Sequence, residues 1–413
     1  MPKSHRFAFA SISLLFFLFG FITCLNDILV PHLKSLFDLN YRQSMLIQFS
    51  FFSAYFFFSL PAGYIVKKFG YPTGVVIGLA IAGFGALGFL PAAHFHSYEL
   101  FLTTLFVLAC GVTLLQVAAN PYTSALGPAE TAPARLNLAQ AFNSLGTSIA
   151  PMLGAYLILS TASHTETQST NLPYFIIASI LFILSFVFKK LSLPDIPEQE
   201  FENEVVGKDS VTTIFQHPQL IFGILGIFCY VGAEVGIGSI LVNYIVSCWN
   251  IEEREAGHYV AIYWTLAMCG RFIGFYFLNK YRASSCLRFA TVSAVLLVLS
   301  GIFVRNSLSP YFFMCVGLLN SIMFPVTFSL SIEGLGRHTS KAASFLCMAI
   351  VGGAVLPVIQ GWISDSWGLR MGFLIPLLGY VYLAWFASQR RRASLAHDGQ
   401  TPVYSKLSSK THV

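Results

Sequence analysis

Long apolar segments without charge constrain this chain more than any other feature of its sequence. Residues 100–129 and 136–165 contain no Asp, Glu, Lys or Arg, and only a short loop with Glu130 and Arg135 separates them. Each segment exceeds the roughly 20 residues that an α-helix needs to cross a bilayer. Because every backbone polar group must be hydrogen-bonded inside hydrocarbon, segments of this kind fold as membrane-spanning helices.

The composition extends this interpretation to the whole chain. Hydrophobic residues make up 55% of the 413 residues and charged residues only 10%, whereas a soluble domain carries roughly 25% charged residues. We therefore predict an all-α polytopic membrane protein with twelve transmembrane helices in two six-helix halves. The predicted helices cover about 7–30, 44–66, 73–91, 99–124, 138–160, 174–188, 220–246, 257–279, 287–304, 311–332, 342–363 and 371–389. The predicted domains are an N-terminal bundle (1–190), a cytoplasmic linker (191–218), a C-terminal bundle (219–389) and a polar cytoplasmic tail (390–413).

The two halves of the sequence share a repeated pattern. The segment around residues 114–151 has a counterpart around residues 324–363. Corresponding residues are Pro121 and Pro325, Leu126 and Leu335, and Pro151 and Pro357, at offsets of 204, 209 and 206. A chain built from two similar membrane halves is typical of transporters.

Basic residues are distributed unevenly between the two predicted faces of the membrane. Of the 24 Lys and Arg residues, 18 lie on the side of the N-terminus and 5 on the opposite side, and Arg271 lies within a helix. Because Lys and Arg concentrate in cytoplasmic loops, we expect an inner (plasma) membrane protein with both termini in the cytoplasm. The net charge of +6 thus reflects orientation, and we expect no nucleic-acid partner.

Four amides lie inside the two uncharged helices described above. They are Gln116, Asn120, Gln140 and Asn143. An amide in hydrocarbon is costly unless it finds a partner or lines a wet cavity. The four amides therefore predict a polar cavity that binds substrate, and the alternative is that they hold neighbouring helices together by hydrogen bonds.

Two carboxylates fall within predicted membrane helices. Asp27 follows Asn26 near the outer end of the first helix, and Glu234 lies well inside the seventh helix among glycines. The two are separated by 207 residues, which matches the repeat offset. Since an ionisable residue inside the membrane is a functional hypothesis by default, we predict that Asp27 and Glu234 couple transport to a cation. The alternatives are an interfacial position for Asp27 and a structural ion pair between Glu234 and Arg271.

Other residues complete the predicted site. Asn26, Trp264 and Asn320 are candidate substrate ligands, since aromatic faces stack on the C–H surface of sugars and amides bind hydroxyls; packing is the alternative role for the aromatic residue. Arg271, Lys67 and Arg135 are candidate structural or gate residues.

Several enzymatic and metal-binding motifs are absent from the sequence. None of the eight cysteines forms a C-x-x-C pair, and neither H-E-x-x-H nor the G-x-x-x-x-G-K-[ST] phosphate loop occurs. We therefore predict no metal site, no cofactor and no enzymatic activity.

The motifs resemble those of the fucose–galactose–glucose/proton symporter branch of the major facilitator superfamily. The shared segments are FFLFGFITCLNDILVPHL, PAGYIVKKFGYPTG, AANPYTSALGP, RLNLAQAFNSLGT, FCYVGAE and GRFIG. LLQVAANPY together with YVGAEV is most similar to the bacterial glucose/galactose transporter subgroup. The resemblance implies a fold of two bundles, a central sugar cavity and alternating access from the two sides of the membrane.

The resemblance also implies roles for particular residues. In the L-fucose/proton symporter, acidic residues in the first and fourth helices serve proton coupling and sugar recognition, and the first of these matches Asp27. The fourth-helix acid is replaced here by Gln116, whereas Glu234 stands where that symporter has Gln. The sugar-contacting amides of the Q-x-F-N segment match Gln140 and Asn143. Lys67 replaces the acid of the superfamily's G-x-x-x-D-R-x-G loop.

We therefore expect a hexose importer driven by a proton or sodium gradient, with glucose or galactose as the substrate and fucose as the alternative. The alternatives are an ion-independent facilitator, an N-acetylglucosamine carrier and a membrane sugar sensor. The expected partners are a sugar, the cation and membrane lipid, and we expect a monomer.

Overall fold

The computed structural model describes residues 3–36, 41–161, 166–191, 193–194, 196 and 216–400. These residues form helices and no strand. The N-terminal helices are α1 (Lys3–Leu36), α2 (Tyr41–His94), α3 (Tyr98–Ala125), α4 (Ala132–Thr161) and α5 (Glu166–Lys190). The C-terminal helices are α7 (Pro218–Trp249), α8 (Glu253–Lys280), α9 (Ala283–Phe303), α10 (Ser309–Asn320), α11 (Met323–Ile332), α12 (Thr339–Met348), α13 (Gly352–Trp367), α14 (Leu369–Gly372) and α15 (Leu374–Gln400).

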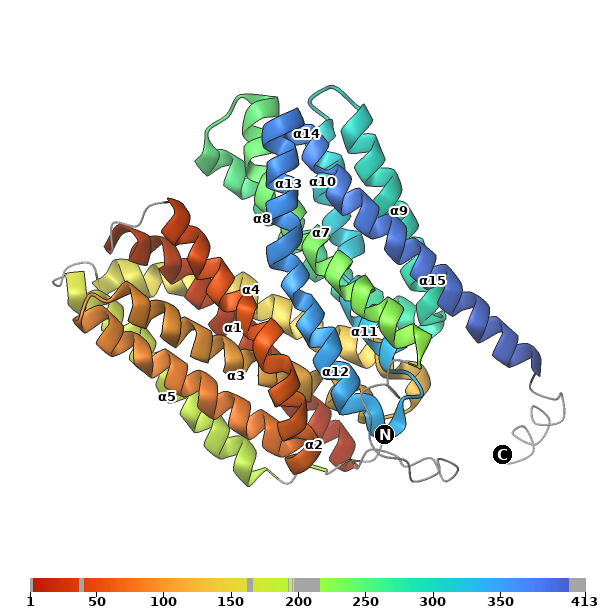
Figure 1. The fold of residues 1–413 in the computed structure, drawn as a ribbon, viewed down its shortest axis with the longest axis horizontal. Helices are drawn as coiled ribbons and strands as arrows, with labels where there is room; N and C mark the ends of the chain where they lie inside the picture. Colours follow the sequence, from red (N-terminus) through yellow and green to blue (C-terminus); the bar gives the residue numbers. More distant parts are fainter. Residues whose placement is uncertain are drawn as a thin grey trace.

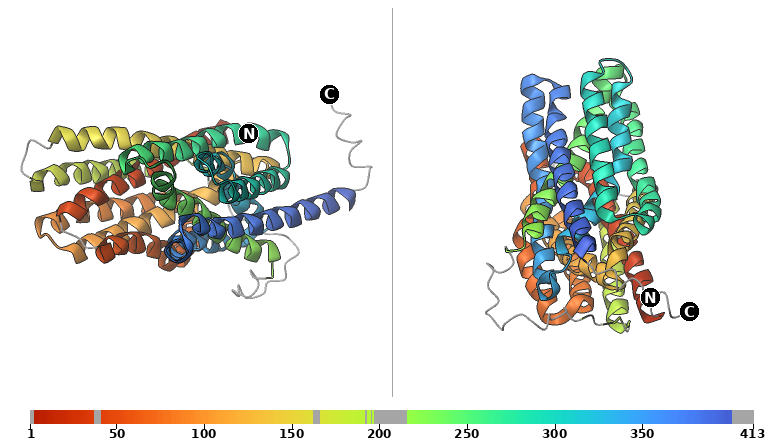
Figure 2. Two further views of the ribbon diagram at one scale, coloured as in Figure 1. Left: turned by 90° about the horizontal axis from the view of Figure 1, so that it is seen from above. Right: turned by 90° about the vertical axis from the view of Figure 1, so that its right-hand side faces the viewer.

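The helices form two groups that follow the halves of the sequence. In the N-terminal group α2 packs on α3 and α5, and α1 packs on α4. In the C-terminal group α15 packs on α7 and α9, α8 packs on α10, and α13 packs on α7. Figures 1 and 2 show the two groups side by side, with α1 to α5 on one side and most of α7 to α15 on the other. The arrangement agrees with the predicted all-α class.

Two predicted helices, 44–66 and 73–91, are continuous in α2 apart from a single sharp turn. Gly70 at this turn has φ 80° and ψ 165°, a backbone conformation that is not helical. Glycine adopts positive φ without the steric cost that a Cβ imposes. The predicted loop is therefore compressed to little more than one residue, beside the exposed Lys67 and Lys68.

Two other predicted spans are also divided, and the first break lies beside a proline. The predicted helix 311–332 is divided into α10 and α11, with a break at Ser321 and Ile322. Pro325 has no N–H to donate to the carbonyl of residue 321, so the regular helical ladder cannot continue there. The predicted helix 342–363 is likewise divided into α12 and α13, joined by one 3-10 turn, Ala349–Val351.

The terminal helices extend beyond their predicted ends. A polar tail is predicted from residue 390, whereas α15 continues to Gln400. Arg, Ala, Leu and Gln have high helix propensity, and Arg390 forms an ion pair with Glu333 at 2.5 Å. The greater part of the predicted linker (191–218) and residues 401–413 lie outside the described residues.

Within the described part of the chain, nine helical stretches are long and apolar enough to cross a membrane, judged by length and composition alone. One of them, residues 49–94, covers most of the predicted span 44–66 and all of the span 73–91. The total of twelve stays a prediction.

The two groups of helices contact each other near the end where α12 begins. The Ser340 hydroxyl donates to the Tyr71 hydroxyl across this contact at 3.4 Å. Gly63 packs so closely on Ser344 that a Cβ at position 63 would collide with the serine side chain. Figure 1 shows α12 beside α2 and α3 near the N-terminus, with α14 at the opposite end of the molecule. The helices that meet here come from opposite halves of the sequence.

Candidate functional site

A carboxylate and a guanidinium face each other inside the C-terminal group. Glu234 lies on α7 and Arg271 on α8, and the Arg271 Nη2 and Glu234 Oε1 atoms are 3.9 Å apart. Only 13% of each side chain is exposed. The alternative that the sequence left open, an ion pair between these residues, is thus present in the structure. Since buried charges need partners, each charge of this pair compensates the other.

Three buried side chains surround this pair. The Tyr263 hydroxyl donates to the Glu234 backbone carbonyl at 3.1 Å, and Asn320 Nδ2 donates to the Tyr263 hydroxyl at 2.8 Å. The Tyr230 hydroxyl donates to the Asn320 carbonyl at 3.1 Å and also faces the Glu234 carboxylate. Asn320 is the last residue of α10, so the proline-induced break lies directly beside this network.

Arg271 also reaches the other half of the molecule. Its Nη1 atom donates to the Gln140 backbone carbonyl on α4 at 3.2 Å, and also to the Ser144 hydroxyl. In return, the Asn137 side chain of α4 donates to the Arg271 carbonyl at 2.6 Å. One guanidinium therefore touches the carboxylate of its own half and the backbone of the opposite half.

The predicted amides of the N-terminal half form a hydrogen-bonded chain. Gln140 Nε2 donates to Asn120 Oδ1 at 3.3 Å, and Asn120 Nδ2 donates to Gln116 Oε1 at 2.9 Å. Asn120 is fully buried and also interacts with the Cys347 side chain of α12. Gln116 is partly exposed. The structure thus brings three of the four predicted amides together at the contact between the halves.

The fourth amide has a different partner. Asn143 Nδ2 donates to the Phe16 carbonyl of α1 at 3.0 Å, and Gly20 of α1 packs directly against Asn143. This contact joins α1 to α4. It corresponds to the helix-joining alternative for this residue, while the role of Asn143 as a sugar ligand stays a prediction.

Trp264 lies outside the buried network, on the face of α8 that also carries Met268 and Arg271. Its side chain is 44% exposed, and its ring contacts Tyr263 edge-on at 5.0 Å. Residues 264, 268 and 271 share one face of a helix, and Met268 on that face contacts Ser148 of α4. Trp264 therefore lies one helical turn from Met268, at which this face of α8 contacts the other half.

The remaining predicted residues occupy other positions. Arg135 is buried and donates to the Thr123, Ser124 and Pro128 carbonyls and to the Thr131 hydroxyl. The Thr123 and Ser124 carbonyls lie in the last turn of α3, where a cation stabilises the helix, so Arg135 is a helix cap. Lys67 is exposed at the end of the first part of α2. Asn26 and Asp27 belong to α1, and their side chains lie outside the described part of the structure.

Several residues of the network were missed by the sequence analysis. Asn137 and Ser144 share a helix face with Gln140, and Tyr230 lies one turn before Glu234 on α7, so helical periodicity could have found all three. The fully buried Tyr380 of α15, which lies near Asn320, gave no such signal because it belongs to a distant helix.

The eight cysteines form no disulfide, and no group of three or more metal-ligating side chains occurs among the described residues. The long apolar helices of the described residues define a polytopic membrane protein, and the polar network at the contact of its two halves is the candidate site. The family model described as Major Facilitator Superfamily matches residues 12–350, and the chain belongs to this superfamily. The family predicted from the motifs is confirmed.

Particular members of the family match most of the chain. The sequence is 47% identical to the glucose/galactose transporter of Brucella abortus biovar 1 (strain 9-941) over 390 residues, 93% of this chain and 94% of the relative. It is 32% identical to the L-fucose-proton symporter of Escherichia coli (strain K12) over 418 residues, 95% of each. A solved structure of the transporter FucP in the outward conformation matches with a TM-score of 0.87 and 31% identity, covering 94% of this chain and 99% of that one.

Proposed function

We propose that this protein imports a hexose of the glucose/galactose type together with a proton, by exposing one site alternately to the two sides of the membrane. It is a transporter and not an enzyme. The similarity to a glucose/galactose transporter and to an L-fucose-proton symporter supports the substrate and the cation. The single observation that carries the mechanism is that Arg271 contacts both Glu234 and α4 of the opposite half.

Sugar recognition is assigned to polar and aromatic groups at the contact between the halves. Among the described residues the Nε2 group of Gln116 has no hydrogen-bond acceptor, although its Oε1 atom is held by Asn120. A fixed amide with a free donor suits a sugar hydroxyl. The exposed ring of Trp264 offers an apolar face for the C–H surface of the same sugar. Because these groups come from α3 and α8, one bound sugar would contact both halves.

Cation coupling is assigned to the Glu234–Arg271 pair, together with Asp27, which is the sequence counterpart of Glu234. While Glu234 is ionised, its negative charge compensates the positive charge of Arg271, and the two halves stay in contact where Arg271 meets α4. When Glu234 takes up a proton, the positive charge of Arg271 remains in the contact without a counter-charge. A buried charge that loses its partner destabilises the closed contact. Separation of the halves would hydrate Arg271. Protonation of Glu234 therefore favours opening of the contact between Arg271 and α4.

This sequence of events has the direction that import requires. The proton enters while this contact is closed, and its binding weakens the closed contact. Release of sugar and proton on the other side then restores the ionised pair and the closed contact. We prefer a proton over sodium as the coupled cation because protonation by itself changes the charge of Glu234, and no additional ligands for a metal ion are needed.

Uptake by purified protein in proteoliposomes tests the proposal. Labelled glucose and galactose should accumulate with an inward proton gradient, and not with a sodium gradient alone; L-fucose and N-acetylglucosamine serve as competing substrates. Glu234→Gln should lose accumulation and retain counterflow exchange, because a Gln cannot change its charge. Glu333→Gln is the matched control, since Glu333 is an exposed acid that pairs with Arg390. Accumulation that ignores every ion gradient would identify a facilitator instead, and binding without uptake would identify a sensor.

We further propose an inner-membrane location with both termini in the cytoplasm, from the distribution of basic residues. The His5 ring bonds to the Leu126 carbonyl, and Arg390 pairs with Glu333, so both ends of the described chain contact loops predicted to be cytoplasmic. A cysteine placed at position 210 in a cysteine-free background should resist impermeant maleimide in intact cells, whereas one in residues 162–165 should react. Labelling at position 210 would reverse the orientation.

A further inference from the structure

A cavity of about 490 Å³ opens at the end of the C-terminal group that bears α14. Its walls come from three places: the end of α7, the turn between α9 and α10, and the junction of α13 with α14. Tyr244 lies ten residues beyond Glu234 on α7, which corresponds to about 15 Å along a helix. The cavity is therefore separate from the network at the contact of the halves.

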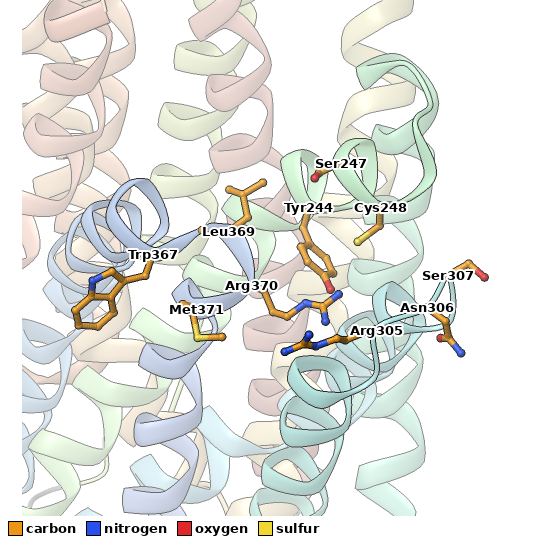
Figure 3. A pocket seen from close by; sticks show the side chains of 11 residues that line it. Tyr244, Ser247, Cys248, Arg305, Asn306, Ser307, Trp367, Leu369, Arg370 and Met371 are labelled. Atoms are coloured by element: carbon orange, nitrogen blue, oxygen red, sulfur yellow. The ribbon is translucent and has the colours of Figure 1, made fainter.

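Two arginines line this cavity without a carboxylate partner. Figure 3 shows the side chains of Arg305 and Arg370 reaching into the same space beside the Tyr244 ring. Within the described residues neither guanidinium lies within 4.0 Å of an acidic oxygen. Arg370 makes one long hydrogen bond, to the Ile302 carbonyl at 3.5 Å, and its Cζ atom lies 5.9 Å from the centre of the Tyr244 ring. Arg305 has no hydrogen-bond acceptor among the described residues.

The walls that carry the arginines are held in place by specific contacts. The Trp249 indole donates to the Ser307 carbonyl at 2.8 Å, and the Leu308 N–H donates to Asn306 Oδ1 at 3.0 Å. These bonds fix the turn that presents Arg305. Gly368 has φ 95°, a conformation that favours glycine, and the resulting sharp turn places Arg370. Both arginines are thus presented by ordered turns.

Positive charge is unusual at this end of such a protein. The sequence predicts this end to face away from the cytoplasm, where Lys and Arg are normally few. Only five basic residues are predicted on that side, and two of them line this one cavity. Two like charges in a shared cavity repel each other unless an anion lies between them. A neutral hexose supplies no such charge.

We infer that this cavity is an anion site that binds a phosphate group. Guanidinium groups bind phosphate oxygens through paired, charge-assisted hydrogen bonds. Ser247, Ser307 and Asn306 add neutral donors from two of the three walls, which suits a tetrahedral group with several oxygens. The phosphate belongs either to the head group of an anionic phospholipid or to a soluble phosphate compound. Exposed Trp367 at the rim would contact the acyl region of a lipid, since Trp favours the membrane interface.

Thermal unfolding of the purified protein in detergent tests this site. Phosphatidylglycerol, phosphatidylcholine and inorganic phosphate are titrated separately against the wild type, Arg305→Gln and the double variant Arg305→Gln/Arg370→Gln. A charge-assisted hydrogen bond corresponds to about a tenfold change in affinity. We therefore expect the half-saturating concentration of the active probe to rise about tenfold in Arg305→Gln and further in the double variant. Arg254→Gln, a basic residue of the same predicted face that does not line the cavity, should behave as the wild type.

The probes separate the two sources of phosphate. Stabilisation by phosphatidylglycerol but not by inorganic phosphate assigns a lipid head group, and stabilisation by inorganic phosphate assigns a soluble compound. Native mass spectrometry provides a second measurement, in which phosphatidylglycerol retained by the wild type should be lost from Arg305→Gln. Because Arg305 is exposed and bonds to no described residue, this variant should fold even if the double variant does not. Equal half-saturation and equal lipid retention in the wild type and Arg305→Gln would overturn the inference.

Discussion

Neutralising Glu234 should open the contact between the two halves of the protein. The Glu234 and Arg271 charges are 3.9 Å apart, and at an effective dielectric constant of about 20 they attract each other by about 4 kcal/mol. Desolvation of the pair offsets part of this attraction. We therefore expect Glu234→Gln to destabilise the closed contact by about 2 kcal/mol, which corresponds to an open fraction about 30-fold larger.

Cys347 provides the assay for this opening. It is fully buried and lies between the halves beside Asn120, so a maleimide can reach it only when the contact opens. In a background where Cys347 is the sole cysteine, the rate of alkylation should rise about 30-fold in Glu234→Gln, provided that opening is fast relative to the chemical step.

The double variant Glu234→Gln/Arg271→Gln distinguishes charge from local damage. It contains no uncompensated charge, and its alkylation rate should therefore fall back towards that of the wild type, although it lacks the bonds from Arg271 to α4. Circular dichroism and thermal unfolding verify that each variant is folded. An alkylation rate in Glu234→Gln equal to that of the wild type would refute the assignment of Arg271 as the link between protonation and the contact.

Three further predictions concern the walls of the site and the helices that support it. Gly63→Leu should accelerate alkylation of Cys347 and slow uptake, because the new side chain collides with Ser344; Gly257→Leu, where nothing lies near the added Cβ, is the control, and equal alkylation would contradict the packing argument. Arg135→Gln should lower the free energy of unfolding by about 1–3 kcal/mol, because the carbonyls at the end of α3 lose a charged donor; a raised KM with unchanged thermal stability would instead place Arg135 in sugar binding. Trp264→Ala should raise the KM for sugar with little change in thermal stability, since the ring is 44% exposed, and an unchanged KM would remove Trp264 from the sugar site.

The membrane class and the approximate helices could be predicted from the sequence because their causes are local. A bilayer requires about 20 apolar residues for each span, and a sequence displays them directly. The segment at 99–124 was therefore placed within a residue of α3, Tyr98–Ala125. The break after Asn320 also has a local cause in Pro325, and it was missed because hydropathy takes no account of a lost backbone N–H.

The partners of the polar residues were decided by tertiary structure alone. Arg271 lies 131 positions along the chain from Gln140 and 127 from Ser144, and hydropathy contains no information on how one helix is rotated about its axis against another. Residue type predicted that Arg271 and Glu234 would need partners, since both carry charge inside the membrane. That a single guanidinium serves the carboxylate and the opposite half together depends on the crossing of α8 with α4.

The same distinction applies to Arg305 and Arg370, which line the cavity beside α14. The sequence places Arg305 and Arg370 in two separate loops on one face of the membrane, because each follows a predicted span. They share a single cavity because Gly368 and the bond from Trp249 to Ser307 direct the two turns towards each other. Composition and periodicity determine how many charges lie on each side of the membrane, whereas the packing of the helices determines which of those charges meet.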